Sequence, residues 1–474
     1  MKIYQNLIAN QWMASDSGTT ITITNPATES HAGQVNLASK AQVVQACDAA
    51  AKAQRGWRKT PAIARADFMR RLADALLARK DAIGTALALE SGKSLDDATN
   101  EAVYAADITR YHAEWARRIE GEVIPSDSAS ENLVLHREPL GVVACLIPFN
   151  YPVYTLLRKI APALITGNTV VVRPSNNTPC SAFEIAQAVL DAGLPEGVVN
   201  IMAMDHDAAK QMCTHPKVAM ITLTGSVTAG RLMLEFSKVN IARVSLEMGG
   251  KTPAIITPSA DLDQAITRIV ASKTTHCGQL CTAVERVYVQ RARYDPALDR
   301  LRRAMQQRAF GDRAADPSHM GPQVSAAARQ GIHDMVQRAV ANGAKLECGG
   351  VMPEGKGFFY PPTLLSGVRQ DAEVVQEETF GPVLCVLPYD DFDDALSLAS
   401  DHQYGLASVL FSHDYREVMQ ASNEIEAGEL YINRTPADPY QGYHAGWKRS
   451  GLGGDDGKHG MLEFTQTRLV VMPY

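Results

Sequence analysis

Hydrophobic and polar residues follow two different patterns along the chain. In the first hundred residues, apolar positions recur every three or four residues over 41–58 and 62–91, which is the spacing of a helix with one buried face. A Thr-rich strand over 19–24 is predicted before them. From residue 142 the pattern changes to short runs rich in Val and Ile, each followed by enough residues for one helix. These runs occupy residues 142–147, 169–173, 198–202, 218–223 and 242–247. Because they show no polar alternation, they predict parallel strands buried between two layers of helices.

The same pattern starts again near residue 252. Strands are predicted over 252–257, 286–290 and 382–387, with a helix from about residue 261 and a basic helix over 296–308. Repeated strand–helix units of this length are typical of the α/β class. The first series predicts a doubly wound, Rossmann-type domain, and the second predicts another α/β domain.

Two further strand candidates have no predicted partner nearby. Residues 121–134 indicate a β-hairpin with its turn at 125–128, and residues 464–474 indicate a terminal strand. Unpaired strands leave open hydrogen-bonding edges. We therefore expect another subunit to pair with them, in a homo-oligomer of two or four chains.

The composition excludes several classes of function. Of 474 residues, 46% are hydrophobic and 21% are charged, and 46 Lys and Arg face 52 Asp and Glu, for a net charge of −6. This composition is typical of a globular protein and offers no basic patch for nucleic acid or a membrane surface. The longest apolar run, residues 140–149, is far shorter than the ~20 residues of a membrane helix. The first residues lack the apolar core of a signal peptide, so we expect a cytoplasmic protein.

Eight cysteines are scattered along the chain. In a chain this long without a secretory signal, no disulfide framework is expected. Six of the cysteines are expected to be buried as small apolar residues: Cys47, Cys145, Cys180, Cys213, Cys348 and Cys385. His276, Cys277 and Cys281 lie close together, but no second Cys/His pair stands at ligand spacing, so we expect no metal site.

Three short stretches carry candidate chemistry. Residues 148–152 place Asn150 between two prolines directly after a predicted strand, at the strand end where α/β proteins bind ligands. Glu247 ends the strand 242–247, just before two glycines. Cys281 follows Gly278, which allows close approach of the backbone. Taken singly, these features are better explained as a turn, a helix cap and a buried structural cysteine.

Together, in this order and spacing, the three stretches resemble the signature of the NAD(P)-dependent aldehyde dehydrogenase family. Further matching stretches are Thr224-Gly225-Ser226, residues 377–383 and Tyr404-Gly405-Leu406. Within the family, the chain most resembles the bacterial lactaldehyde and glycolaldehyde dehydrogenases, in residues 113–122, 285–290, 431–434 and 442–460. The similarity runs from residue 25 to the terminal strand, and it implies that the protein oxidises an aldehyde to a carboxylic acid.

The resemblance implies a role for each of the three residues. Cys281 would add to the aldehyde as the nucleophile, because a thiol is partly ionised near neutral pH. The Asn150 amide and the Cys281 backbone N–H would stabilise the resulting oxyanion, and Glu247 would activate the water that releases the acid from the thioester. Lys159 is assigned to the same catalytic group. Cys277 is expected to pack rather than react, with an oxidative disulfide to Cys281 as the alternative.

The resemblance also implies a site for NAD or NADP. Its contact positions in this chain are Ile147, Pro148, Phe149, Arg173, Ser175, Asn176, Gly225, Ser226, Met248, Gly249, Glu378 and Phe380. Glu378 would hold the nicotinamide ribose. Where the family usually has Glu, this chain has Asn176, which removes a negative charge that would repel a 2′-phosphate. Where the family usually has Lys, this chain has Arg173, whose guanidinium suits a phosphate better. We therefore expect NADP to be accepted at least comparably with NAD.

The resemblance further implies a division of the chain. It predicts an NAD(P)-binding domain of residues 1–118 and 139–246, a catalytic domain of residues 247–430, an oligomerisation arm of residues 119–138 and 455–474, and a substrate loop of residues 431–454 that returns to the cofactor domain.

Polar residues near the expected mouth of the site indicate the class of aldehyde. Arg158, Asp438 and His444 are the candidate substrate contacts, and they suit a small hydroxylated aldehyde such as lactaldehyde or glycolaldehyde. Arg158 fits a surface residue equally well, and His444 a loop histidine. The alternative substrate is an anionic aldehyde such as phosphonoacetaldehyde, sulfolactaldehyde or succinate semialdehyde, because Arg158 and His444 also suit a fixed anion.

Proteins with functions of other classes would need different residues. A CoA-acylating relative generally lacks the hydrolytic Glu, and a non-catalytic structural relative would tolerate loss of the thiol. A cysteine hydrolase needs a histidine that activates the thiol. His276 is too close in sequence to turn onto Cys281, so the intact set of Cys281, Glu247 and Asn150 favours the dehydrogenase.

Overall fold

Val- and Ile-rich strands form the centre of the first sheet in the computed structural model, which describes residues 2–474. The central strands are β8 (Val142–Leu146), β9 (Thr169–Arg173), β10 (Val199–Ile201), β11 (Val218–Gly225) and β12 (Arg243–Met248), which are parallel to one another. The sheet has eight strands in the order β22-β12-β11-β8-β9-β10-β2-β3. Its edge strands β2 (Asn6–Ile8), β3 (Gln11–Met13) and β22 (Gly451–Leu452) pair antiparallel. The predicted parallel sheet is confirmed.

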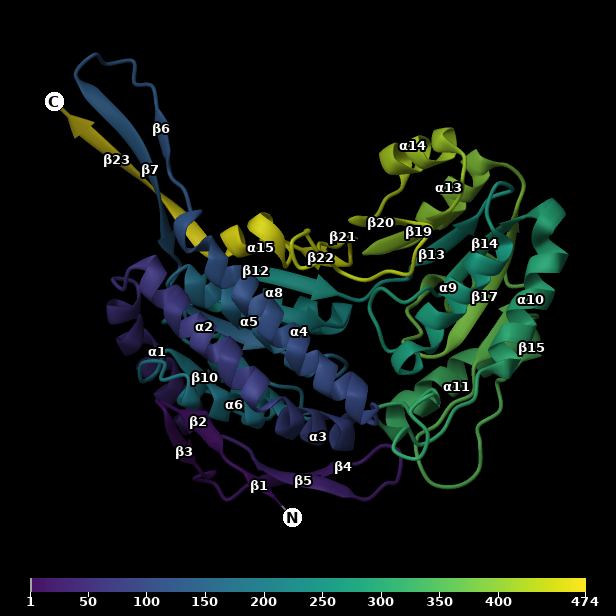
Figure 1. Ribbon diagram of the computed structural model, residues 1–474, viewed down its shortest axis with the longest axis horizontal. Helices are drawn as coiled ribbons and strands as arrows, with labels where there is room; N and C mark the ends of the chain where they lie inside the picture. The colour runs from purple at the N-terminus through teal and green to yellow at the C-terminus, as the bar shows by residue number, and fades with distance from the viewer. Residues whose placement is uncertain (1) are drawn as a thin grey trace.

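Helices cover both faces of this sheet (Figure 1). Those that pack on its strands are α1 (Lys40–Trp57), α5 (Pro152–Ile165), α6 (Cys180–Asp191), α7 (His206–Cys213) and α8 (Val227–Asn240). An outer layer of α2 (Ala62–Ala78), α3 (Lys80–Ser91) and α4 (Leu95–Ala113) packs over α5 and α6, and α15 (Gly457–Glu463) packs against α5. The single helical stretch predicted over 62–91 is in fact two helices, because Arg79 leaves the helical conformation with φ −106° and ψ 5°.

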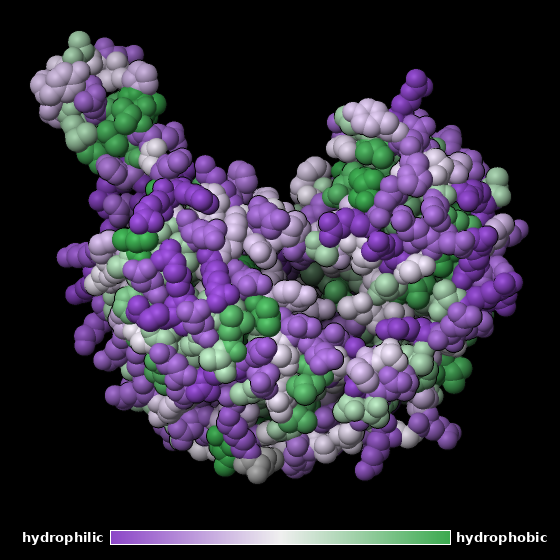
Figure 2. Space-filling view, viewed as in Figure 1, coloured by the Kyte–Doolittle hydropathy of each residue, from purple (hydrophilic) through white to green (hydrophobic). Residues whose placement is uncertain are grey.

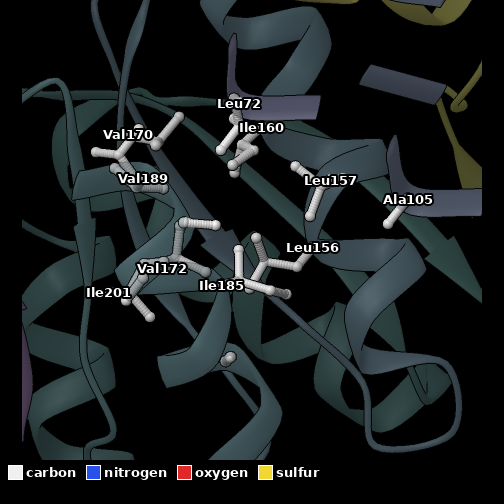
Figure 3. Packing of buried hydrophobic residues seen from close by; sticks show 14 of the residues in the cluster. Leu72, Ala105, Leu156, Leu157, Ile160, Val170, Val172, Ile185, Val189 and Ile201 are labelled. Atoms are coloured by element: carbon white, nitrogen blue, oxygen red, sulfur yellow. The ribbon is translucent and has the colours of Figure 1, made fainter. Parts of the chain in front are cut away.

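The first lobe has two apolar clusters, and the larger one is its main core. Leu156 and Ile160 of α5 and Val170 and Val172 of β9 are fully buried in it, and Ile185 of α6 packs in the same cluster (Figure 3). Burying this apolar area is the main force that fixes the sheet and its helices. The rigid sheet in turn fixes the loops at the carboxyl ends of its strands.

The second lobe contains a seven-stranded sheet in the order β15-β16-β17-β14-β13-β19-β20. Its strands are β13 (Pro253–Ile256), β14 (Arg286–Gln290), β15 (Lys345–Cys348), β16 (Thr363–Ser366), β17 (Val383–Tyr389), β19 (Ala407–Phe411) and β20 (Glu429–Ile432). The helices around it are α9 (Leu262–Thr274), α10 (Tyr294–Gln307), α11 (Ala326–Ala341), α12 (Glu373–Gln376), α13 (Phe392–Ser400) and α14 (Tyr415–Glu424). Only β15 is antiparallel within this sheet, so the predicted second α/β series is also confirmed.

Smaller elements complete the two lobes. A three-stranded sheet joins β1 (Ile3–Tyr4), β5 (His31–Asn36) and β4 (Thr20–Thr24), the last of which agrees with the predicted Thr-rich strand. Strands β18 (Tyr404–Gly405) and β21 (Trp447–Lys448) form a two-stranded ribbon. The short helices are η1 (Glu114–Arg117), η2 (Thr275–Gly278) and η3 (Arg291–Arg293). The domain boundaries stay a prediction.

An arm of three strands projects from the first lobe and carries the C-terminus (Figure 1). It consists of β6 (Glu122–Ile124), β7 (Glu131–Pro139) and β23 (Thr465–Pro473). The hairpin and the terminal strand were expected to have no local partner, but β23 pairs antiparallel with β7 from Thr465↔Pro139 to Pro473↔Glu131, and pairing with another subunit stays a prediction. The outer edges of β6 and β23 stay open within the described chain, and apolar side chains gather on the arm (Figure 2).

Within residues 2–474, no helix combines the length and the apolar character that crossing a membrane requires.

Candidate active site

The three sequence stretches converge from different elements. Asn150 lies in the loop between β8 and α5, Glu247 lies in β12, and Cys281 follows η2 in the second lobe. Asn150 and Glu247 are buried, whereas Cys281 is only partly buried. Cys281 shares this partial exposure only with Cys348, which was expected to be buried, and the other six cysteines are buried.

An unusual backbone presents the Cys281 thiol. His276 and Cys277 have positive φ angles of 46° and 56°, and Gly278 has a φ of 72°. A Cβ at Gly278 would lie 2.4 Å from the carbonyl oxygen of Gly381, so only glycine fits this turn. Cys277 is buried in this turn, and burial raises the pKa of its thiol to about 12, which agrees with a packing role.

Asn150 ties the first lobe to the cysteine loop. Its Nδ2 donates a hydrogen bond to the carbonyl oxygen of Gln279 at 2.9 Å. An amide NH₂ has two hydrogens, so one remains for a substrate oxygen. The start of α5 is held in turn by Glu101, whose Oε1 accepts hydrogen bonds from the backbone N–H groups of Val153 at 2.9 Å and Tyr154 at 3.1 Å.

Cys281, Glu247 and His444 form one cluster, in which Glu247 and His444 are buried and Cys281 is partly exposed. The thiol sulfur, a carboxylate oxygen and a ring nitrogen of these residues all lie within 4.8 Å of one another. Burial and the Glu247 carboxylate raise the pKa of the Cys281 thiol to about 12, and His444 acts in the opposite direction. His276 was expected to be too close in sequence to reach the thiol, but His444, from a distant part of the chain, lies beside it.

His444 makes contacts through both ring nitrogens. Nε2 lies 3.2 Å from Glu247 Oε1, and Nδ1 lies 2.8 Å from Glu429 Oε1. Burial acts to lower the pKa of His444, but Asp438 and Glu429 outweigh it and raise that pKa well above its ordinary value. Glu429 was not predicted from the sequence, because nothing in the strand that carries it distinguishes it from an exposed glutamate.

Arg158 is a buried residue rather than a surface residue. Its Nε donates to Asp456 Oδ1 at 3.0 Å, and its Nη2 pairs with Asp456 and lies 3.5 Å from Asp438 Oδ2. Lys159 is fully buried, and its Nζ pairs with both carboxylate oxygens of Asp455, at 2.7 and 3.0 Å. The structure thus places Lys159 in a buried ion pair with Asp455, and its assignment to the catalytic group stays a prediction.

The residues expected near the nicotinamide lie close together. A Cβ at Gly249 would be 2.2 Å from Glu378 Oε2, and Oε1 of Glu378 accepts a hydrogen bond from the backbone N–H of Gly250 at 3.1 Å. Burial and Glu285 raise the pKa of Glu378 to about 8. The rings of Phe149 and Phe380 meet edge to face with centroids 5.7 Å apart.

The residues expected near the adenosine offer free polar groups. The Nε of Arg173 and the Oδ1 of Asn176 are buried and have no hydrogen-bond partner in the protein. Ser226, which follows Gly225 at the end of β11, caps helix α8 by accepting a hydrogen bond from the N–H of Ala229 at 3.2 Å. Buried polar atoms without a hydrogen-bond partner destabilise the fold, so a ligand that forms hydrogen bonds with them fits this region.

The remaining expected cofactor contacts lie beside these groups. Ile147 is buried at the end of β8 and precedes Pro148, Ser175 follows β9, and Met248 is buried at the end of β12. The carboxyl ends of these strands therefore face the region where a dinucleotide binds in folds of this type. The residues present fit an NAD(P) site.

Glu285 holds the loops of the site together. Its carboxylate pairs with Nζ of Lys251 and with Nζ of Lys273 at 2.9 Å, and it accepts hydrogen bonds from the backbone N–H groups of Thr379 at 2.9 Å and Phe380 at 3.1 Å. Burial acts to raise the pKa of Glu285, but the two lysines outweigh it and lower that pKa to about 2.

Comparison with known proteins gives concordant matches. The model of the "Aldehyde dehydrogenase family" matches residues 12–470. The chain is 43% identical over 454 residues to lactaldehyde dehydrogenase of Escherichia coli, with 95% of each chain covered. It is 34% identical over 474 residues to D-glyceraldehyde dehydrogenase (NADP(+)) of Thermoplasma acidophilum, with 98% of this chain and 96% of the relative covered. The crystal structure of lactaldehyde dehydrogenase from Escherichia coli matches with a TM-score of 0.98 at 41% identity, with 100% of both chains covered.

Proposed function

Because this chain belongs to the aldehyde dehydrogenase family and is an aldehyde-oxidising enzyme that uses NAD or NADP, we propose that Cys281, Glu247 and Asn150 carry out the oxidation of a small, uncharged, hydroxylated aldehyde. One observation carries this proposal: the Cys281 thiol and the Glu247 carboxylate lie together, and the Asn150 amide bonds to the carbonyl oxygen of Gln279, two residues before Cys281.

The thiol of Cys281 starts the reaction. A planar carbonyl carbon has no hydride that it can readily give up, so a nucleophile must first add to it. The Cys281 sulfur adds to this carbon, and the carbonyl oxygen becomes an oxyanion. The free hydrogen of the Asn150 amide and the Cys281 backbone N–H stabilise that charge, and loss of one such donor typically costs ~2.7–4 kcal/mol of barrier.

NAD or NADP, when bound, supplies the hydride acceptor. Glu378, Gly249 and Phe380 would hold its nicotinamide end, and Arg173 and Asn176 its adenosine end. Oxidation leaves a thioester on Cys281. Glu247 then takes a proton from water, and the resulting hydroxide releases the carboxylic acid and returns the thiolate.

The charges around the site favour an uncharged substrate. Three cations, Arg158, Lys159 and His444, face five carboxylates, namely Asp438, Asp455, Asp456, Glu247 and Glu429. Because every cation is already paired, an added anion would meet a surplus of negative charge. This disfavours phosphonoacetaldehyde, sulfolactaldehyde and succinate semialdehyde. Carboxylates and the His444 ring suit hydroxyl groups, so lactaldehyde and glycolaldehyde are the preferred substrates.

The functions of other classes fit the site less well. A CoA-acylating enzyme would not need a carboxylate beside the thiol, and Glu247 lies there in a buried position. A structural relative would not need to keep the thiol partly exposed.

A substrate and cofactor panel tests the proposal. Initial rates of NADH and NADPH formation should be highest for lactaldehyde or glycolaldehyde and lower for phosphonoacetaldehyde, benzaldehyde and hexanal, with the free acid as product. Cys281→Ala should abolish activity. Acyl-CoA as the product, or a kcat/KM for an anionic aldehyde above that for lactaldehyde, would contradict it. A kcat/KM for NAD more than about 100-fold above that for NADP would contradict the expected use of NADP.

The assembly and the location are further parts of the proposal. The open outer edges of β6 and β23, with the exposed apolar side chains of Val123 and Leu469, support pairing with a second subunit through the arm. A homo-oligomer of two or four chains in the cytoplasm is what the sequence predicts.

A further inference from the structure

The two carboxylates around His444 define the protonation of its ring. Nδ1 lies 2.8 Å from Glu429 Oε1, and Nε2 lies 3.2 Å from Glu247 Oε1. A carboxylate oxygen accepts hydrogen bonds and has none to donate. Both contacts are therefore hydrogen bonds only when both ring nitrogens carry a hydrogen, which makes His444 an imidazolium cation.

The groups that face His444 support this charge. Asp438 Oδ2 lies 3.5 Å from Nδ1, in addition to Glu429 and Glu247. The nearby cations are neutralised elsewhere, because Arg158 pairs with Asp456 and Asp438, and Lys159 pairs with Asp455. The ring is 1% exposed, so water screens these charges little.

The Cys281 sulfur lies where this cation acts on it. Sulfur, a Glu247 oxygen and a ring nitrogen of His444 are all within 4.8 Å of one another. Burial disfavours a thiolate at this point, because little water is present to solvate its charge. Within the cluster of Cys281, Glu247 and His444, only His444 supplies a positive charge that stabilises a thiolate.

We propose that His444 is a positioning residue for the nucleophile, an imidazolium that holds the thiolate of Cys281 in an ion pair. In the step it assists, the S–H bond of Cys281 breaks, its electron pair stays on sulfur, and the proton forms an O–H bond on Glu247. The Nε2–H of His444, which bonds to Glu247 before the step, then bonds to sulfur. This inference rests on the proposed function and gives His444 a role separate from substrate contact.

The reactivity of the thiol tests this role without turnover. Wild type, His444→Gln, His444→Lys and His459→Gln are treated with iodoacetamide across a pH series in the absence of aldehyde, and the alkylated peptides are quantified by mass spectrometry. His459→Gln is the matched control, since that histidine is exposed in the same C-terminal segment. Cys348, the other partly exposed thiol, is an internal reference in every sample.

We expect His444→Gln to slow alkylation of Cys281 about tenfold at pH 7 and to move the midpoint of its pH profile up by about one unit. His444→Lys, which keeps a cation, should stay within about threefold of wild type, and Cys348 should react alike in all samples. An unchanged Cys281 profile in His444→Gln overturns the inference, even if turnover is lost. If His444→Gln does not fold, a folded His444→Lys whose Cys281 reacts about tenfold more slowly overturns it. Full turnover by wild type alkylated at Cys281 would instead overturn the proposed function.

Discussion

Glu247 is buried beside Cys281, where it is suited to remove a proton from the water that attacks a thioester. Glu247→Gln keeps the size of the side chain and removes the base. We expect this variant to release about one equivalent of NADH or NADPH per active site in a single burst, slower than in wild type because the Cys281 proton must pass to water instead of Glu247, and then to stop, because the acyl group stays on Cys281. Stopped-flow absorbance measures the burst. Glu196→Gln, at an exposed position, is the control and should turn over normally. Steady turnover by Glu247→Gln would show that another group activates the water.

Asn176 lies in the region expected to bind the adenosine, and its Oδ1 has no partner there. Asn176→Glu introduces a carboxylate that repels a 2′-phosphate. We expect kcat/KM for NADP to fall at least about tenfold, while the value for NAD stays within about threefold. Asn177→Glu places the same charge on the exposed neighbouring residue and should change neither value by more than about threefold. Equal losses for both cofactors in Asn176→Glu would contradict the assignment of this region.

For a single residue, the sequence predicts a functional role when a short motif surrounds that residue. Asn150, Glu247 and Cys281 each lie at a strand end or a glycine turn, so their neighbours mark them. The contacts of His444 with Glu247 and Glu429 could not be predicted, because β12, β20 and the C-terminal loop carry these residues from distant parts of the chain. The ion pairs of Arg158 with Asp456 and of Lys159 with Asp455 could not be predicted for the same reason.

At the scale of elements, the turn after β12 is shaped by glycine. A Cβ at Gly249 would lie 2.2 Å from Glu378 Oε2, so Gly249→Ala must displace that carboxylate. We expect the Kd for NADPH, measured by fluorescence titration, to rise about tenfold, because Glu378 can no longer take its place in the cofactor site. Gly331→Ala in helix α11 is the control, since nothing lies within 4 Å of the added carbon. An unchanged Kd in Gly249→Ala would show that Glu378 does not hold the cofactor.

The predicted elements agree best with the structure where unbroken apolar runs mark them. The Val-rich strands β8 to β12 were predicted from unbroken apolar runs, because burial on both faces leaves no other pattern. The division of residues 62–91 into α2 and α3 was missed, since Arg79 is an ordinary helix-forming residue that carries no break signal. The pairing of β7 with β23 was missed because it joins segments far apart in the chain.

At the scale of the whole molecule, Glu285 joins the segments that carry the site. Its carboxylate lies between Lys251 and Lys273 and holds the backbone of Thr379 and Phe380. Removing one partner of a buried ionic group typically costs about 3–5 kcal/mol, because the remaining charges lose their compensation. Glu285→Gln should therefore lower the melting temperature at pH 7, whereas Glu354→Gln, at an exposed position, should leave it unchanged.

The pH dependence of this stabilisation distinguishes an ionised Glu285 from a residue that only fills space. The folded protein holds the pKa of Glu285 at about 2, below its ordinary value of 4.5, so its charge stabilises the fold fully above pH 4.5 and progressively less as the pH falls toward 2. By linkage, the contribution at pH 7 is about 3 kcal/mol, and it is about 1 kcal/mol smaller at pH 4. The difference in melting temperature between wild type and Glu285→Gln should accordingly narrow between pH 7 and pH 4 in parallel calorimetric scans. A melting-temperature difference that stays constant from pH 7 to pH 4 would mean that Glu285 acts through packing alone. Another negative group would then have to balance the charges of the two lysines.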